Sequence, residues 1–163
     1  MTVRARGVRL LVLDVDGVLT DGRLWFGPGG EALKAFHVRD GLGIRRLRAA
    51  GVEVAIISGR SHPAVAARMR ELGVTEVLQG VEDKGDALAG LLARLGVAGA
   101  ECACLVDDTP DLPLMRAVGL PAAVADAEPE VLAAARHVTR RAGGLGAVRG
   151  FCDWLLAAHG GGR

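Results

Sequence analysis

The stretch from Leu10 to Gly22 constrains the fold more than any other part of the chain. Its first residues, LLVL, are apolar and run directly into DVDG. An unbroken apolar run of this kind is typical of a strand buried on both faces, as the strands of parallel sheets are. Asp14 and Asp16 therefore follow the end of a buried strand, where ligands bind in open parallel sheets. Unless they lie in a solvated turn, buried carboxylates need a cation, hydrogen bonds or a reaction.

Length and composition fit one domain spanning residues 1–163, with a sizeable core. Half of the residues are hydrophobic but only 3% are aromatic, so Ala, Val, Leu and Gly must carry the packing. The formal net charge is +1, from 20 basic and 19 acidic residues, which indicates no general affinity for nucleic acid or a membrane surface.

The first residues imitate a signal peptide, because Arg4, Arg6 and Arg9 stand before an apolar run. Asp14 and Asp16 interrupt that run too early for a secretory core or a membrane-spanning helix, and we expect a cytoplasmic protein.

The three cysteines agree with a reducing compartment. Cys102 and Cys104 alternate in a predicted strand and Cys152 lies in a predicted helix. We expect buried free thiols rather than metal ligands or a disulfide.

Strands and helices are predicted to alternate along the chain. Residues 23–37 read as a hairpin that turns at Gly27, Pro28, Gly29 and Gly30. After it, strands are expected at Val52–Ile57, Glu76–Leu78, Cys102–Val106, Ala122–Ala125 and from Val138. Helices are expected at Asp40–Ala50, Ser61–Leu72, Asp83–Leu95, Pro113–Val118, Glu128–Ala135 and Leu145–Ala158, with a frayed end at Gly160–Arg163. This order predicts an α/β fold: a Rossmann-like parallel sheet with helices on both faces and a small hairpin insertion.

Chemically active side chains follow the predicted strands, at the point where each strand ends. They are Asp14 and Asp16, then Ser58, Gly59 and Arg60, then Lys84, then Asp107, Asp108 and Asp111. In a parallel sheet these positions converge on one rim, where five carboxylates would repel one another. Mg²⁺ suits oxygen-only ligands and usually takes one or two carboxylates together with waters and a phosphate. The set therefore predicts a magnesium site that handles phosphate.

The predicted rim offers a part for each step of phosphoryl transfer. Asp14 can attack phosphorus, and Asp16 can protonate the leaving alcohol and then deprotonate water. Ser58, Gly59 and Lys84 can hold the phosphoryl oxygens. Taken singly, these residues have plain alternatives: Ser58 as a helix cap, Lys84 as a solvated side chain, Asp107 and Asp108 as caps of the next helix.

Taken in order, these residues resemble the haloacid dehalogenase superfamily of phosphotransferases. Within it, the blocks DVDGVLTDG, LKAFHVRDGLGI, VAIISGR, LQGVEDK, VGLPAAVADA and HVTRRAGGLGAVR resemble the phosphatases of 3-deoxy-D-manno-octulosonate 8-phosphate and their relatives, over about residues 8–158. The resemblance implies a hydrolase without a cap domain, an aspartyl-phosphate intermediate, a step in lipopolysaccharide biosynthesis, and Mg²⁺ held by Asp14, Asp16 and Asp107. It also implies a homotetramer in which the hairpin and the C-terminal tail help close a neighbour's active site.

Substrate contacts are expected from Arg60, Asp108, Asp111 and Arg149, with Arg141 as an alternative anion contact in the glycine-rich tail. The substrates of the resembling enzymes carry a carboxylate, which a guanidinium can bind through two parallel hydrogen bonds. The octulosonate phosphatases have an arginine at the position of Arg60, whereas the nonulosonate 9-phosphate enzymes tend to have a glutamate. The simpler alternative pairs Arg60 with Asp108 or Asp111.

Two departures from the family pattern stand next to the last acidic group. Val106 replaces the usual glycine before Asp107, and Thr109-Pro110 and Leu112 differ from the usual residues around the acids. Neither departure removes a charged group.

Three functions remain open from the sequence: the octulosonate phosphatase, a phosphatase for another sugar phosphate such as a nonulosonate 9-phosphate, and a non-catalytic Mg²⁺-binding receiver or interaction domain. A receiver would carry a lone phosphoacceptor on a middle strand, whereas the second and third strands here end on Ser58 and on Gln79-Gly80.

Overall fold

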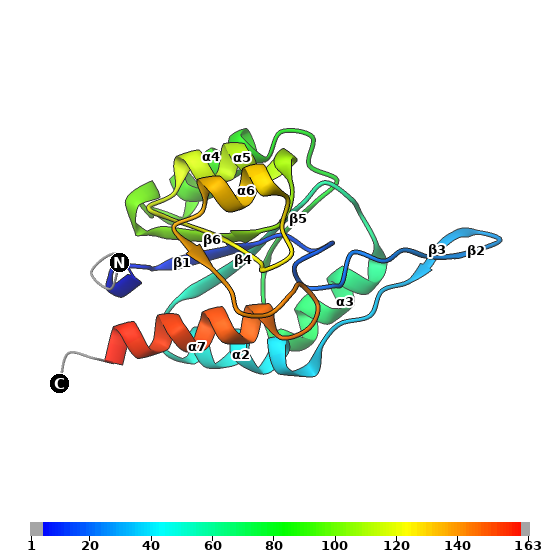
Figure 1. Cartoon of the computed structure of the whole chain (residues 1–163), viewed down its shortest axis with the longest axis horizontal. Helices are drawn as coiled ribbons and strands as arrows, with labels where there is room; N and C mark the ends of the chain where they lie inside the picture. The colour runs from blue at the N-terminus through cyan, green and yellow to red at the C-terminus, as the bar shows by residue number, and fades with distance from the viewer. Residues whose placement is uncertain (1–4, 161–163) are drawn as a thin grey trace.

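The structure is a computed structural model that describes residues 5–160 (Figure 1). The sequence predicts a frayed end over Gly160–Arg163. Gly160 instead ends the last helix, and residues 161–163 lie outside the described residues.

Six parallel strands form the central sheet, in the order β5-β4-β1-β6-β7-β8. Their bounds are β1 Leu10–Leu13, β4 Glu53–Ser58, β5 Glu76–Gln79, β6 Cys102–Val106, β7 Leu120–Ala123 and β8 His137–Val138. The first strand is central: it pairs in parallel with β4 on one side and with β6 on the other. The predicted parallel sheet is thus confirmed, and Asp14 lies in the middle of its rim.

Helices cover both faces of the sheet (Figure 1). One face carries α4 Lys84–Leu95, α5 Leu112–Ala117 and α6 Pro129–Ala134, and the other carries α2 Val38–Ala49, α3 Pro63–Leu72 and α7 Ala147–Gly160. Two short 3₁₀ turns, η1 Gly99–Glu101 and η2 Thr109–Asp111, flank β6. All four residues of β1 are completely buried between these layers. This double coverage explains why the strand is apolar throughout instead of alternating.

Several element ends differ from the predicted ones, for identifiable reasons. Helix α2 begins at Val38, whereas the sequence predicts a start at Asp40. His37 caps this helix by accepting a hydrogen bond from the Arg39 amide at 3.1 Å. The last helix begins at Ala147 rather than Leu145, because Gly146 has a φ of 97° that no helix accommodates.

Strand β7 begins at Leu120, two residues before the predicted start, and ends at Ala123. Pro121 is the second residue of this strand, near the strand beginning where proline is tolerated.

The predicted hairpin is present as β2 Trp25–Gly27 and β3 Gly30–Leu33, and it projects from the body of the molecule (Figure 1). Gly30 closes its turn with a φ of 103°. Within residues 5–160, this hairpin is the only sheet inserted between β1 and α2, and no cap domain is present there. Phe26, at 68% exposure, and Trp25, at 49%, lie uncovered on it.

The three cysteines are free and buried, as the sequence predicts. Over the part of the chain that the structure describes, no helix has both the length and the apolar character needed to cross a membrane.

Candidate active site

A cleft of about 300 Å³ opens at the C-terminal ends of the central strands. Every residue proposed from the sequence for catalysis, metal or phosphate lines it, and so do three of the four proposed substrate contacts. The lining consists of Asp14, Asp16, Gly17, Gly22, Ser58, Gly59, Arg60, Lys84, Asp107, Asp108, Pro110 and Asp111. The exception is Arg149.

A buried ion-pair cluster occupies the floor of the cleft. The Lys84 ammonium lies 3.1 Å from Asp14 Oδ2 and 2.5 Å from Asp111 Oδ1, and all three side chains are nearly inaccessible to solvent. Lys84 reaches this position because it is the first residue of α4, which Asp83 caps. Burial alone would lower the pKa of Lys84, but the charges of Asp14 and Asp111 more than offset that effect and raise it. Lys84 is therefore a permanent cation beside Asp14.

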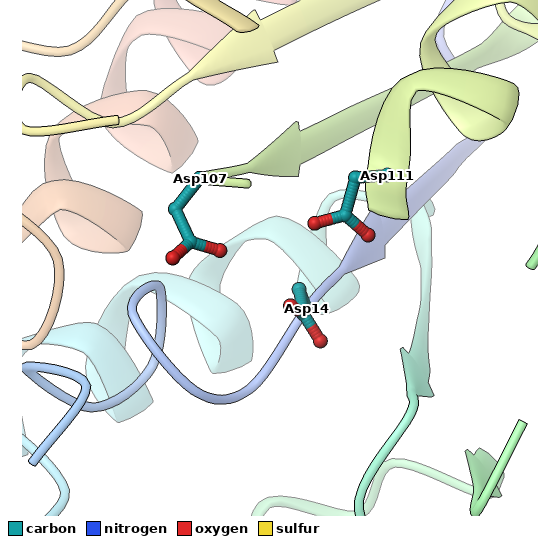
Figure 2. A group of neighbouring side chains, drawn as sticks. All are labelled: Asp14, Asp107 and Asp111. Carbon is teal, nitrogen blue, oxygen red and sulfur yellow. The ribbon is translucent and has the colours of Figure 1, made fainter. Parts of the chain in front are cut away.

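Asp14 and Asp111 of this cluster converge with a third carboxylate, Asp107 (Figure 2). Asp14 follows β1, Asp107 follows β6 and Asp111 ends η2, and each offers an oxygen within 4.8 Å of the others. Burial, followed by the charge of Asp111, raises the pKa of Asp14 from 3.8 to about 7. Burial, followed by the charges of Asp14 and Asp111, raises the pKa of Asp107 to about 8. The single positive charge of Lys84 does not neutralise the three carboxylates, which are called the acidic cluster below.

The donor set fits a hard divalent cation. Asp107 Oδ1 and Asp111 Oδ2 are buried and have no hydrogen-bond partner among the described residues. Unpartnered buried oxygens are costly, and a cation bound to oxygen ligands removes that cost. Asp14 and Asp107 are the two expected ligands that the geometry brings together, with Asp111 as the third member.

Asp16, the third ligand expected from the sequence, is oriented differently. Its Oδ1 accepts a hydrogen bond from Lys34 and its Oδ2 lies 3.7 Å from Arg60 Nε, so neither oxygen joins the acidic cluster. A metal contact from Asp16 would have to come from its backbone carbonyl or from a reoriented side chain.

Glycine is required at two close backbone approaches. A Cβ on Gly17, whose φ is 83°, would collide with the Asp107 carboxylate. A Cβ on Gly143 would collide with the Gly17 carbonyl. The Gly143 amide donates to Asp126 Oδ1 at 2.9 Å, and the Gly144 amide donates to the Val18 carbonyl at 2.9 Å. Within one chain, the glycine-rich tail loop therefore supports that chain's own loop after β1.

The remaining residues at the rim of the sheet differ in how exposed they are. Ser58 ends β4, is buried at 2% exposure and opens into the cleft beside Gly59. Asp108 is exposed, and its Oδ1 accepts from the Thr109 amide at 2.6 Å, which matches the capping alternative considered for it. Val106, where the resembling family usually has glycine, is the buried last residue of β6, and Asp107 still reaches the cleft.

Arg60 pairs with neither Asp108 nor Asp111. Its Nη2 donates to Glu31 Oε2 at 2.7 Å, and the side chain is 46% exposed at the mouth of the cleft.

Arg149 lies away from the cleft. Its amide donates to Asp40 Oδ1 at 2.8 Å and its Nε to Asp153 Oδ2 at 2.6 Å. It lines a second cavity, of about 610 Å³, beside β8 and α7 that also includes Arg141. A substrate contact from either residue thus has no support within the single chain.

Sequence reasoning placed Glu31 and Lys34 in the hairpin, and Lys34 also in the family-like block LKAFHVRDGLGI, but gave neither a role in the site. Glu31, in β3, contacts Arg60 of the cleft, and Lys34, directly after β3, contacts Asp16. A signal was available, because Lys34 and Lys84 are the only lysines in a chain with 20 basic residues.

Comparison with known proteins agrees with this geometry. The model of the haloacid dehalogenase-like hydrolases matches residues 73–148. The chain is 50% identical over 157 residues to 3-deoxy-D-manno-octulosonate 8-phosphate phosphatase KdsC of Escherichia coli (strain K12), covering 96% of this chain and 84% of the relative. The chain therefore belongs to the haloacid dehalogenase-like hydrolase family.

Solved structures of octulosonate 8-phosphate phosphatases, a class within this family, are similar to the chain over almost its whole length. The crystal structure of the octulosonate 8-phosphate phosphatase of Yersinia pestis superposes with a TM-score of 0.94 at 48% identity, covering 97% of this chain and 85% of that one. The Moraxella catarrhalis enzyme, described in complex with magnesium ion, phosphate ion and KDO, superposes with a TM-score of 0.93 at 39% identity, covering 96% and 90%. The chain is a phosphoric monoester hydrolase that resembles these octulosonate phosphatases.

Proposed function

We propose that the chain hydrolyses 3-deoxy-D-manno-octulosonate 8-phosphate, with Mg²⁺ as cofactor and an aspartyl-phosphate intermediate on Asp14. The observation that carries the proposal is the arrangement of Asp14 at the centre of the rim. It lies 3.1 Å from the buried Lys84 ammonium and within 4.8 Å of the other carboxylates of the acidic cluster.

The Mg²⁺ cofactor predicted from the sequence is confirmed by the acidic cluster and by the magnesium-bound relative. Asp14 and Asp107 would hold the ion, with Asp111 beside them. When bound, Mg²⁺ neutralises charge on the phosphoryl oxygens and so makes the phosphorus accessible to an anionic nucleophile.

The chain's own residues supply the chemistry in two steps. In the first, an Asp14 carboxylate oxygen attacks phosphorus, the phosphorus–oxygen bond to the sugar breaks, and the leaving oxygen takes a proton from Asp16. In the second, water attacks the same phosphorus and gives its proton to Asp16, and Asp14 leaves as a carboxylate. Lys84 and the buried Ser58 would hold phosphoryl oxygens during both steps.

The eight-carbon substrate is favoured over a nonulosonate 9-phosphate by Arg60. Its guanidinium stands at the mouth of the cleft, past Ser58, and is half exposed, so a substrate carboxylate can reach it. Relatives from Escherichia coli and Salmonella typhi, 49–50% identical to this chain, are named octulosonate 8-phosphate phosphatases. Hydrolysis of another sugar phosphate is the alternative.

A homotetramer is part of the proposal, supported by the uncovered apolar surface of the hairpin: Leu24, Trp25, Phe26 and Leu33 are between 43% and 68% exposed. Apolar patches of this kind mark association surfaces. A monomeric mass in solution would contradict it. A cytoplasmic location is supported by the three free buried thiols, and we treat residues 1–163 as one catalytic domain.

The test is a phosphate-release screen of purified protein with Mg²⁺ against a panel of sugar phosphates. We expect kcat/KM for octulosonate 8-phosphate to exceed that for every other sugar phosphate in the panel, including a nonulosonate 9-phosphate. A hexose phosphate or the nonulosonate 9-phosphate as best substrate would contradict the assignment.

Arg60→Ala separates carboxylate recognition from phosphate chemistry. We expect kcat/KM for octulosonate 8-phosphate to fall about 100-fold, the scale of losing a charge-assisted bidentate contact. Hydrolysis of an aryl phosphate that has no carboxylate should change little. Equal losses on both substrates would mean that Arg60 acts only through its ion pairs with Glu31 and Asp16.

A further inference from the structure

We propose that Lys34, on the inserted hairpin, is the positioning residue for Asp16. The inference rests on the proposed function, because it assigns Lys34 to the proton-transfer group of that reaction.

The contacts of Lys34 repeat those of Lys84. Its ammonium lies against Asp16 Oδ1 and 2.8 Å from Glu31 Oε1, and its side chain is only 1% exposed. Each of the two lysines is thus a buried cation between two carboxylates, one of which belongs to the Asp14-x-Asp16 pair. Because a buried ammonium is costly without anionic partners, this arrangement holds both partners in place.

The choice of lysine fits the space. The chain uses arginine for its other basic positions, and Lys34 and Lys84 are its only lysines. An ammonium is a compact point charge, whereas a guanidinium is a wide planar fork. A slot with 1% side-chain exposure between two carboxylates suits the smaller group.

Glu31 extends the arrangement to the mouth of the cleft. Glu31 forms ion pairs with both Lys34 and Arg60. Arg60 Nε in turn lies 3.7 Å from Asp16 Oδ2, so the four side chains form a closed ring of alternating charges. The hydrogen bonds from Lys34 and Arg60 lower the pKa of Glu31, so its charge is maintained. The hairpin is also tied to α3, because the His62 ring lies 3.2 Å from the Glu31 carbonyl oxygen. Glu31 and Lys34 of the hairpin therefore fix the side chain that moves protons.

The two chemical steps respond differently to a misplaced Asp16. With 4-nitrophenyl phosphate, the first step transfers the phosphoryl group to Asp14 and releases nitrophenolate, which leaves without needing a proton. The second step needs Asp16 to take a proton from the attacking water. A displacement of about 1 Å at a catalytic group can cost about 100-fold in rate.

The experiment compares wild type with Lys34→Met in rapid-mixing and steady-state assays with Mg²⁺ and 4-nitrophenyl phosphate. We expect the variant to release about one nitrophenolate per subunit in a fast phase, at a rate close to that of wild type. A steady rate lowered about 100-fold should follow. The steady-state kcat for octulosonate 8-phosphate should fall to a similar extent, with KM changed less than about threefold. A purely structural role for Lys34 would slow the fast and steady phases together, and that result, or unchanged steady rates, would overturn the proposal.

Two further variants guard the test. Arg23→Met removes an exposed ion pair with Asp21 just before the hairpin and should leave both phases unchanged.

If Lys34→Met alone does not fold, the double variant Glu31→Gln/Lys34→Met removes the charge left unpaired on the hairpin. We expect the double variant to fold and to retain the slow steady phase, and wild-type turnover in it would refute the inference. Because the aryl phosphate assay contains no sugar acid, failure of the substrate assignment would not affect this result.

Discussion

Asp14→Asn is expected to reduce phosphate release by about 10⁶-fold, the scale observed when a covalent enzyme loses its nucleophile. An amide oxygen is a poor nucleophile and cannot form the acyl phosphate. The fold should survive, because burial and the charge of Asp111 already disfavour the Asp14 anion and raise its pKa to about 7. A neutral side chain of nearly the same shape removes that repulsion. The thermal midpoint of the metal-free variant should equal or exceed that of wild type.

The matched control is Asp86→Asn, which makes the same chemical change at an exposed position in the first turn of α4, outside the cleft. It should leave turnover within a factor of about two, because surface substitutions have small effects. Substantial phosphate release by Asp14→Asn would contradict the covalent mechanism.

Removal of Mg²⁺ has the second largest expected effect. Chelation should lower turnover by about 100-fold or more, since charge neutralisation by a metal ion is worth several kcal/mol in the transition state. Added Mg²⁺ should restore it. Ca²⁺, which prefers longer bonds and more ligands, should restore it poorly. Full turnover in excess chelator would rule out the metal site.

The same carboxylates predict how stability depends on pH. Burial, with the charges of neighbouring carboxylates, raises the pKa of Asp14 to about 7 and that of Asp107 to about 8, above the value of 3.8 in an unfolded chain. The metal-free folded state then binds more protons than the unfolded state, so these groups make it less stable as the pH rises from about 4 to about 8. Mg²⁺ needs the deprotonated forms, and its affinity should rise over the upper part of that range. Thermal midpoints at pH 5 and pH 8 check this: Mg²⁺ should raise the midpoint more at pH 8.

The centre of the sheet and its rim were predictable because one strong constraint acts there. A strand buried on both faces must be apolar, so the run LLVL predicts a central strand. The carboxylates that follow it are then predicted to lie at the C-terminal end of that strand. The second strand to carry acids, Cys102–Val106, was predicted with its observed ends for the same reason. Parallel pairing then brought Asp14, Lys84 and Asp107 together without any knowledge of side-chain geometry.

The contacts of the hairpin were not predictable in the same way. Its arms are short and half exposed, so periodicity did not indicate which side chains turn inward. Lys34 reaches Asp16 from the position directly after β3, and this tertiary contact is not encoded by local pattern. Similarly, the orientation of Asp16 toward Lys34 and Arg60 follows from these charges and not from its position after β1.

The central claim, that Asp14 carries the phosphoryl group during turnover, is tested most directly by trapping the intermediate. Wild-type protein with Mg²⁺ would be mixed with a substrate labelled at phosphorus, quenched in acid within one turnover and digested. The account predicts the label on the peptide that contains Asp14, and no label on that peptide in Asp14→Asn. Label on another residue, or phosphate release with no labelled protein at any time, would contradict it.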